Sequence, residues 1–226
     1  MRRGEMGKEQ MIRWNEVFLK KKWGEYGFHE LYEYLIVAGW VARAYRERVR
    51  VLELGCAMGA TTKQLADVGF EVYAVDGAPE AIRRAEERLN NYDNVHLCCS
   101  SFCDLGKIFR HGFFDLVIDV CALQHNRVEE SRAIVDAVQD LMKEGATLWS
   151  MMVADGTTRD IYKDLPYTHF ATENDVKRIF GNLKPLYVEE YIRSMLTGGT
   201  AQSIHWIVCC RKEHPQTSEA KDGDKS

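Results

Sequence analysis

The sequence predicts a protein of the α/β class, with a mostly parallel sheet that ends in an antiparallel hairpin. Apolar runs rich in β-branched and aromatic residues alternate with segments of helical periodicity, as expected when helices connect parallel strands; the runs are residues 49–54, 70–75, 95–99, 113–120 and 147–153. Two further runs, 186–193 and 203–210, have no helical segment between them and flank Thr197-Gly198-Gly199-Thr200, which favours a hairpin. The sequence therefore predicts a seven-stranded sheet.

The composition fits a single domain. Of 226 residues, 46% are hydrophobic, which is enough to bury one sizeable core. No apolar run reaches the ~18 residues of a membrane span, and the first residues lack the apolar stretch of a signal peptide.

The cysteine content and the net charge argue against several kinds of site and partner. Seven cysteines without a Cys-x-x-Cys pair argue against a disulfide framework and against a metal site. A net charge of −4 argues against nucleic acid as the main partner. We expect a cytoplasmic monomer or homodimer without a membrane partner.

The predicted helices cover residues 29–48, 61–68, 79–90, 128–142 and 172–181. Residues 154–170 show no clean period, and a loop of this length in a compact domain is usually functional. We expect residues 1–29 to form a cap or lid, because this segment contains Trp14, Phe18, Trp23 and Tyr26, although plain packing explains these rings as well. Residues 30–212 form the predicted domain, and the polar residues 213–226 a disordered tail.

The loop after the first predicted strand is the strongest sequence signal. The strand ends at Glu53, and the chain then turns through Gly55, Ala57 and Gly59 into a helix. Small residues let the backbone turn tightly and let a ligand approach its N–H groups. A nicotinamide cofactor would favour Gly-x-Gly-x-x-Gly, which this loop does not match, and Glu53 would repel a pyrophosphate.

An acidic residue also ends the second predicted strand. Asp76 lies 21 positions after Gly55, close to the spacing of ~20 residues at which a carboxylate reaches ribose hydroxyls in nucleotide-binding folds. An alternative is that Asp76, with Gly77, caps the helix that begins at Pro79.

The pattern Glu-x-Gly-x-Ala-x-Gly resembles the first motif of class I S-adenosylmethionine-dependent methyltransferases, where glycine usually occupies the position of Ala57. Residues 114–117, Phe-Asp-x-Val, resemble the central-strand motif of the same family. The resemblance implies a three-layer, Rossmann-like sandwich and S-adenosyl-L-methionine as cofactor. The branch that the chain resembles includes tellurite-resistance and sugar methyltransferases, whose acceptors are small molecules.

The resemblance also implies which residues bind the cofactor. Ser101 takes the place of an aspartate that usually binds the adenine amino group, with Phe102 beside the base. The full implied set is Trp23, Glu53, Gly55, Cys56, Ala57, Gly59, Asp76, Gly77, Ser101, Phe102, Asp119 and Val120.

Two histidines are candidates for catalysis. Leu123-Gln124-His125 matches a Leu-x-His pattern of small-molecule members, and the imidazole of His125 could take a proton from the acceptor. The alternative is a histidine that orders the loop at the start of a helix. His169, in the long loop, could assist His125. Arg193 and His205 either face the acceptor or lie on the surface or in the core.

The predicted function is transfer of a methyl group to an O, N or S atom of a small molecule by direct displacement. The Asn/Asp-Pro-Pro-Tyr motif of enzymes that methylate exocyclic amines of bases is absent after the fourth strand. Two alternatives remain: a catalytically silent, methyltransferase-like binding protein, and a nicotinamide-dependent oxidoreductase.

Overall fold

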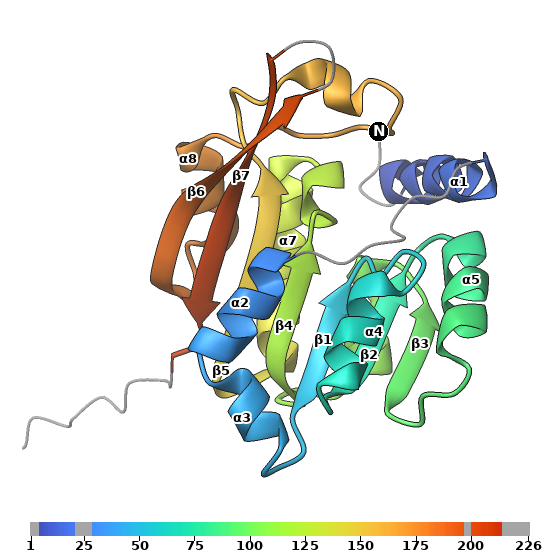
Figure 1. The fold of residues 1–226 in the computed structure, drawn as a ribbon, viewed down its shortest axis with the longest axis vertical. Coiled ribbons are helices and arrows are strands. Elements are labelled where there is room, and N and C mark those ends of the chain that lie inside the picture. The colour runs from blue at the N-terminus through green and yellow to red at the C-terminus, as the bar shows by residue number, and fades with distance from the viewer. Residues whose placement is uncertain (1–4, 21–28, 197–199, 214–226) are drawn as a thin grey trace, which may run out of the picture.

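The computed structural model describes residues 5–20, 29–196 and 200–213. Its seven-stranded sheet has the order β3-β2-β1-β4-β5-β7-β6 (Figure 1). The strands are β1 (Arg50–Leu54), β2 (Glu71–Asp76), β3 (Val95–Cys99), β4 (Phe114–Val120), β5 (Met142–Val153), β6 (Lys184–Leu196) and β7 (Thr200–Arg211). The α-helices are α1 (Glu5–Lys20), α2 (His29–Val37), α3 (Trp40–Ala44), α4 (Ala60–Asp67), α5 (Pro79–Leu89), α6 (Leu105–Ile108), α7 (Val128–Leu141) and α8 (Glu173–Phe180). The 3-10 helices are η1 (Phe102–Asp104), η2 (Leu123–His125) and η3 (Arg159–Tyr162).

Strands β1 to β5 pair in parallel, whereas β7 is antiparallel to both β5 and β6. The predicted α/β class and the antiparallel hairpin are therefore confirmed. After β3 the chain crosses back and adds β4 on the opposite side of β1, which places a topological switch point between β1 and β4. Ligands of open α/β sheets bind at the carboxyl ends of the strands next to such a point.

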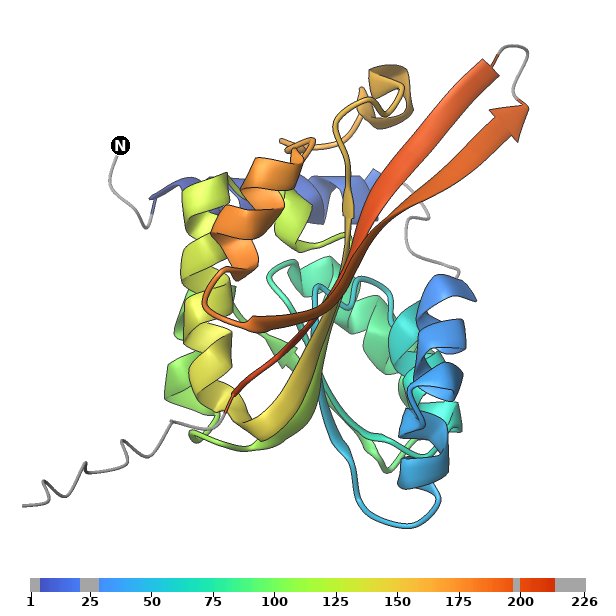
Figure 2. The same cartoon turned by 90° about the vertical axis from the view of Figure 1, so that its left-hand side faces the viewer.

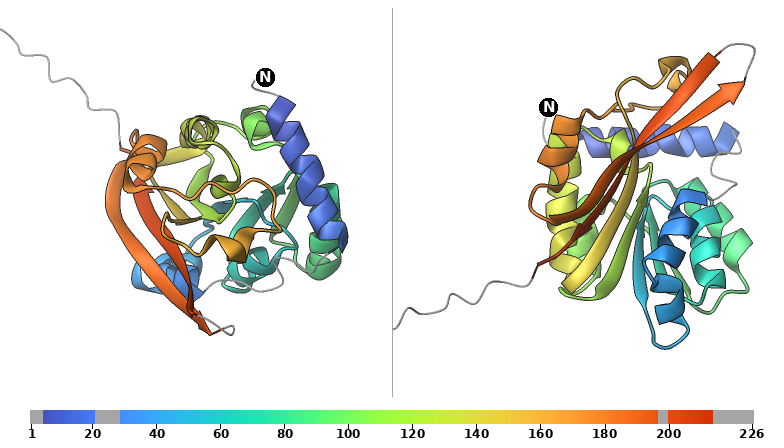
Figure 3. Two further views of the ribbon diagram at one scale, coloured as in Figure 1. Left: turned by 90° about the horizontal axis from the view of Figure 1, so that it is seen from above. Right: turned by 60° about the vertical axis from the view of Figure 1, so that its left-hand side comes forward.

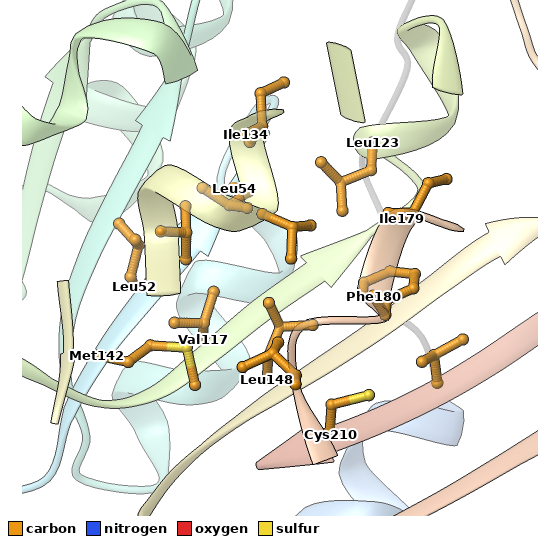
Figure 4. Close-up of a cluster of buried hydrophobic side chains, with 14 of the residues drawn as sticks. Leu52, Leu54, Val117, Leu123, Ile134, Met142, Leu148, Ile179, Phe180 and Cys210 are labelled. Atoms are coloured by element: carbon orange, nitrogen blue, oxygen red, sulfur yellow. The ribbon is translucent and has the colours of Figure 1, made fainter. Parts of the chain in front are cut away.

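Two hydrophobic clusters cover the two faces of the sheet. Figure 2 shows the helices that lie on both sides of the sheet. Side chains alternate along β1, so that Val51 packs toward α2, α3 and α4 while Leu52 and Leu54 pack toward α7 and α8. Figure 4 shows Leu52 and Leu54 in the cluster on the α7 and α8 side of the sheet, together with Ile179 and Phe180 of α8. Burial on both faces explains why the parallel strands read as continuous apolar runs.

The structure corrects several predicted boundaries. The helix predicted over 29–48 is divided into α2 and α3, because Gly39 has a φ of +77°, a left-handed conformation that interrupts the helix. β5 begins at Met142, directly after α7, rather than at Thr147. β6 and β7 extend three residues or fewer beyond each predicted end. None of the described helices combines the length and apolar character that crossing a membrane requires.

Helix α1 lies beyond the carboxyl ends of the parallel strands (Figure 3). It packs on α5, where the backbone N–H of Glu80 donates to Asn15 Oδ1 at 2.8 Å. Phe18 of α1 is buried in a small cluster with Met58 and Ala78. Trp23 and Tyr26, which were predicted for the lid, lie outside the described residues, as does most of the predicted tail.

Candidate active site

The loop between β1 and α4 has a backbone that excludes side chains at two positions. Gly55 and Gly59 have φ values of +73° and +75°. A Cβ at Gly55 would overlap the Cβ of Ala122, and one at Gly59 would lie 2.7 Å from Leu89 Cδ1. Glycine is therefore required at both positions by conformation and by space. The Cys56 side chain between them is buried in the core, and its backbone N–H donates to the oxygen of Val75 at 3.0 Å.

Glu53 lies at the end of β1 with its carboxyl group buried. Thr62 of α4 donates a hydrogen bond to Glu53 Oε2 at 2.6 Å. Burial raises the pKa of Glu53 to about 7, although the bond from Thr62 acts in the opposite direction. Glu53 thus has no cationic partner within the described chain, and a positively charged ligand group would favour its ionised form.

Asp76, at the end of β2, holds the same loop in place. Its Oδ2 accepts the N–H of Ala57 at 2.9 Å, and its Oδ1 accepts the N–H of Ala78, just before α5, at 2.8 Å. Burial raises the pKa of Asp76, and these backbone bonds oppose that rise. A carboxylate has about four lone-pair positions, so Asp76 keeps acceptor capacity for ligand hydroxyls beside these backbone bonds. The N-cap of α5 is Ala78 and no side chain bonds to this cap, so the alternative that Asp76 with Gly77 caps this helix is wrong.

Gly77 lies beneath α1. A Cβ on Gly77 would come within 2.6 Å of the Cγ and Sδ atoms of Met11. This contact brings α1 to the carboxyl end of β2. Met11 carries no functional signal in the sequence, because a methionine in an amphipathic helix is typical of packing alone.

The end of β4 forms the opposite side of the site. Asp119 is fully buried, and its Oδ1 accepts the N–H groups of Ala122 and Leu123 at 2.9 and 3.0 Å. Ser150 Oγ donates to its Oδ2 at 2.5 Å. Burial raises the pKa of Asp119 to about 6. The carboxyl group therefore organises the turn after β4. The Val120 side chain is half-buried and packs against the core on the α2 face. It is therefore the backbone, rather than this side chain, that borders the site at the end of β4.

Ser101 and Phe102 follow β3. The hydroxyl of Ser101 accepts the N–H of Cys103 at 3.3 Å and caps η1. Phe102 lies next to the loop, with its Cζ atom 3.8 Å from the position of a Cβ on Gly55. Both side chains are half-buried. The structure thus brings Phe102 to the first glycine of the loop.

The ring of His125, the last residue of η2, is held between α1 and the loop before α8. Its Nδ1 lies 3.0 Å from the backbone oxygen of Tyr167, so Nδ1 carries the hydrogen of a neutral ring. The Trp14 ring packs on the imidazole with its centroid 4.5 Å away. Gln10 Nε2 donates to the backbone oxygens of His125 and Tyr167 at 2.8 and 3.1 Å. Burial lowers the pKa of His125 to about 4.

His169 is bound to a helix cap. Its Nε2 lies 3.1 Å from Asp175 Oδ2, and Asp175 forms a capping box with Thr172 at the start of α8. Its backbone N–H donates to the oxygen of Gln124, beside His125, at 2.7 Å. The side chain of His169 is therefore engaged with α8, while its backbone joins the long loop to η2.

These residues fit a nucleoside cofactor with an amino-acid arm. Glycines at positions 55 and 59 let Ala122 and Leu89 approach the loop closely, and the carboxyl groups of Glu53 and Asp76 lie at neighbouring strand ends. Glu53 has no cation beside it, and Asp76 has unused acceptor positions. Among the described residues, no group of three or more His, Cys, Asp or Glu is arranged to hold a metal ion.

A family model described as a methyltransferase domain matches residues 46–198, more than half of the chain. The chain belongs to this methyltransferase family. The matched segment runs from just before β1 to just past β6 and includes the loop, both strand-end acids and η2. The family resemblance inferred from the sequence is confirmed.

Known proteins resemble the methyltransferase over parts of its length. The ubiquinone biosynthesis O-methyltransferase of Xanthomonas campestris pv. campestris (strain B100) is 34% identical over 109 residues, which cover 48% of this chain and 44% of that protein. The relative from Xanthomonas axonopodis pv. citri (strain 306) is 33% identical over 111 residues and covers the same shares. The chain thus spans less than half the length of these curated relatives.

Solved structures resemble the methyltransferase over most of its length. The N-methyltransferase NodS from Bradyrhizobium japonicum WM9, in complex with S-adenosyl-L-homocysteine, has a TM-score of 0.68 at 17% identity and covers 91% of this chain and 100% of that one. TehB from Haemophilus influenzae has a TM-score of 0.64 at 17% identity and covers 88% and 67%. At these identities the likeness establishes the fold.

Proposed function

We propose that the protein is an S-adenosylmethionine-dependent methyltransferase that acts on a small molecule by direct displacement. One observation carries the proposal. Glu53, Asp76 and the glycine loop meet at the switch point between β1 and β4, and their remaining capacity matches an ammonium group and a pair of ribose hydroxyls. The NodS complex with S-adenosyl-L-homocysteine and the relatives named as O-methyltransferases support it.

The chain's own residues divide the binding work. Asp76 would accept the ribose hydroxyls, and Glu53 with the backbone of residues 55–59 would hold the amino-acid arm. Ser101 and Phe102 would contact the adenine, and the backbone of residues 119–121 would border the transferred group. The bound cofactor supplies an electrophilic methyl group on a sulfonium. The protein therefore has to align the acceptor and receive its proton.

For His125 the contacts favour the loop-ordering alternative over the role of base. Its Nδ1–H is used by Tyr167, and its Nε2 lies 3.4 Å from the amide nitrogen of Gln124. The ring joins η2 to the loop before α8 and supports Trp14 of α1. We propose that His125 and His169 position these loops around the site, so that the base comes from elsewhere.

Calorimetric titration with S-adenosyl-L-homocysteine tests the proposal, with NAD(H) and NADP(H) as parallel ligands. We expect binding of S-adenosyl-L-homocysteine alone. Asp76→Ala should weaken this binding about tenfold, since a hydrogen bond to a charged group contributes about 1.5 kcal/mol or more. Asp93→Ala removes an exposed acid and serves as the control. Binding of a nicotinamide cofactor instead would support an oxidoreductase.

A further inference from the structure

A second group of polar side chains lies near the end of β4, outside the cofactor residues. The pairing of β6 with β7 brings its members together: Tyr191 and Arg193 of β6 lie opposite His205 and Ser203 of β7. These residues share the face of the hairpin whose other side chains pack toward α2. η3 adds Tyr162 to the group.

Helix α2 contributes a buried carboxylate to the group. Glu30 is 9% exposed, and Arg193 Nη2 donates to its Oε1 at 2.7 Å. Burial alone would raise the pKa of Glu30, but hydrogen bonds to the carboxylate and the charge of Arg193 outweigh it, so this pKa lies below its usual value. The carboxylate is therefore ionised at neutral pH.

Two buried polar atoms of this group have no partner. Glu30 Oε2 and His205 Nδ1 are inaccessible to solvent, and neither meets a hydrogen-bond partner within the described part of the chain. His205 is 6% exposed, and its Nε2 lies 3.3 Å from the Tyr162 hydroxyl. Leaving a buried polar atom unpaired costs about 1–3 kcal/mol, so such atoms are rarely retained without a use.

The group adjoins the predicted transfer site through Cys121. This residue follows β4 directly, and its N–H bonds to the oxygen of Met151 at 2.8 Å. The charges of Asp119, Glu30 and Arg193 all act on its thiol. His205 is paired with Val153 at the carboxyl end of β5. The orphaned atoms are thus on the β5 side of the switch point, opposite the glycine loop.

We propose that Glu30, Tyr162, Arg193 and His205 form the acceptor subsite, and that it takes a small ring-bearing molecule with a hydroxyl or amine group. This inference rests on the proposed methyl transfer. Glu30 Oε2 and His205 Nδ1 are both acceptors when Nε2–H donates to Tyr162, so the ligand must bring O–H or N–H donors. The aromatic neighbours, including the edge-on pair of Tyr162 and Phe170 at 5.6 Å, favour a ring.

The step balances with His205 as proton acceptor. A lone pair of the acceptor's O or N atom forms the bond to the methyl carbon, and the carbon–sulfur bond breaks with its electron pair remaining on sulfur. The proton of the acceptor passes to His205 Nδ1. The charge of Glu30 favours the imidazolium formed, whereas burial and the charge of Arg193 oppose it. The sulfonium charge has then moved to the histidine.

Binding to the protein saturated with S-adenosyl-L-homocysteine tests the subsite without requiring turnover. The probes are two matched pairs: catechol with 1,2-dimethoxybenzene, and benzylamine with benzyltrimethylammonium, which has no N–H group. We expect binding only of the member that carries donors, with a shift of the His205 ring nitrogen signals in NMR spectra. Comparison of catechol binding with benzylamine binding distinguishes a subsite for a hydroxyl group from one for an amine group.

Substitutions of Glu30 and His205 test whether the probes bind at these residues. His205→Gln and Glu30→Gln should weaken probe binding about tenfold or more, with the affinity for S-adenosyl-L-homocysteine changed less than about twofold. His111→Gln, at an exposed histidine, is the control. Equal binding of the methylated analogues, binding of no probe, or full binding by His205→Gln would each overturn the subsite. If the wild-type protein did not bind S-adenosyl-L-homocysteine, that result would instead overturn the proposed function.

Discussion

Ala57 occupies a backbone conformation that favours glycine. Its φ is +49°, and its N–H is fixed by Asp76. Cys121, on the other side of the switch point, has a φ of +61°. Left-handed backbone costs a residue with a side chain about 1–2 kcal/mol. Strain of this kind collects at binding sites, because the surrounding structure holds it in place.

We expect Ala57→Val to lower the free energy of unfolding by about 1–2 kcal/mol, because a β-branched side chain fits positive φ poorly. Ala57→Gly should change it by less than about 1 kcal/mol, since relief of strain is offset by the greater freedom of the unfolded chain. Urea unfolding measures both. Ala42→Val, at an exposed alanine of α3, is the control, and an equal loss there would refute strain at position 57.

At the scale of elements, α1 is tied to the site from three directions. Gln10 bonds to η2 and to the loop before α8, Trp14 packs on His125, and Met11 lies over Gly77. Phe18 is buried on α5 and the glycine loop. That residues 1–29 form a cap or lid stays a prediction, and α1 could leave only by breaking these contacts.

Trp14→Ala should loosen this lid. An aromatic pair is worth about 0.5–1.5 kcal/mol beyond its buried area, so we expect the affinity for S-adenosyl-L-homocysteine to fall about threefold to tenfold. Hydrogen exchange of the α1 amides should quicken and be slowed less by ligand. Ile12→Ala changes a residue of the same helix that is 62% exposed, and it should have no effect. Unchanged affinity for Trp14→Ala would argue that α1 is only packing.

Elements were predictable where their signal is local. The strands were readable from apolar runs, and the helix predicted over 172–181 begins in the structure with a capping box of Thr172 and Asp175. The division of the helix predicted over 29–48 could not be read from the sequence, because Gly39 inside an amphipathic pattern is tolerated in many helices. The early start of β5 was also not predictable, because a glycine such as Gly145 is typical of a helix end but here lies within the strand.

Over the whole molecule, the cofactor half of the site was more predictable than the acceptor half. Glu53, Asp76 and the loop lie at strand ends, so their meeting follows from the parallel order of the sheet. Glu30 and Arg193 are 163 residues apart in the chain, and no periodic pattern connects them. Gln10 and Tyr167 are separated by 157 residues. Contacts of this range depend on how α1, α2 and the hairpin pack, which a single sequence does not show.

Buried titratable groups on both halves make the folding stability depend on pH in opposing directions. Burial raises the pKa of Glu53 to about 7 and that of Asp119 to about 6, so their stabilising contributions are present at low pH and lost as pH rises through these values. Burial lowers the pKa of His125 and of His205 to about 4, so their contributions are present above 6.5 and lost as pH falls. Below about pH 6.5 the two pairs oppose each other, which flattens the stability of the wild-type protein.

Glu53→Gln should expose this balance. The pKa rise from 4.5 to about 7 corresponds to on the order of 3 kcal/mol of stability that the wild-type protein loses between about pH 4.5 and pH 8. Glutamine does not titrate, so the variant should lose less stability over this range, and its optimum should move to higher pH. Urea unfolding across the pH series measures the difference, with Glu33→Gln, at an exposed acid, as the control. Parallel curves for Glu53→Gln and the wild-type protein would mean that Glu53 ionises at its ordinary pKa, and would contradict the effect of burial on this group.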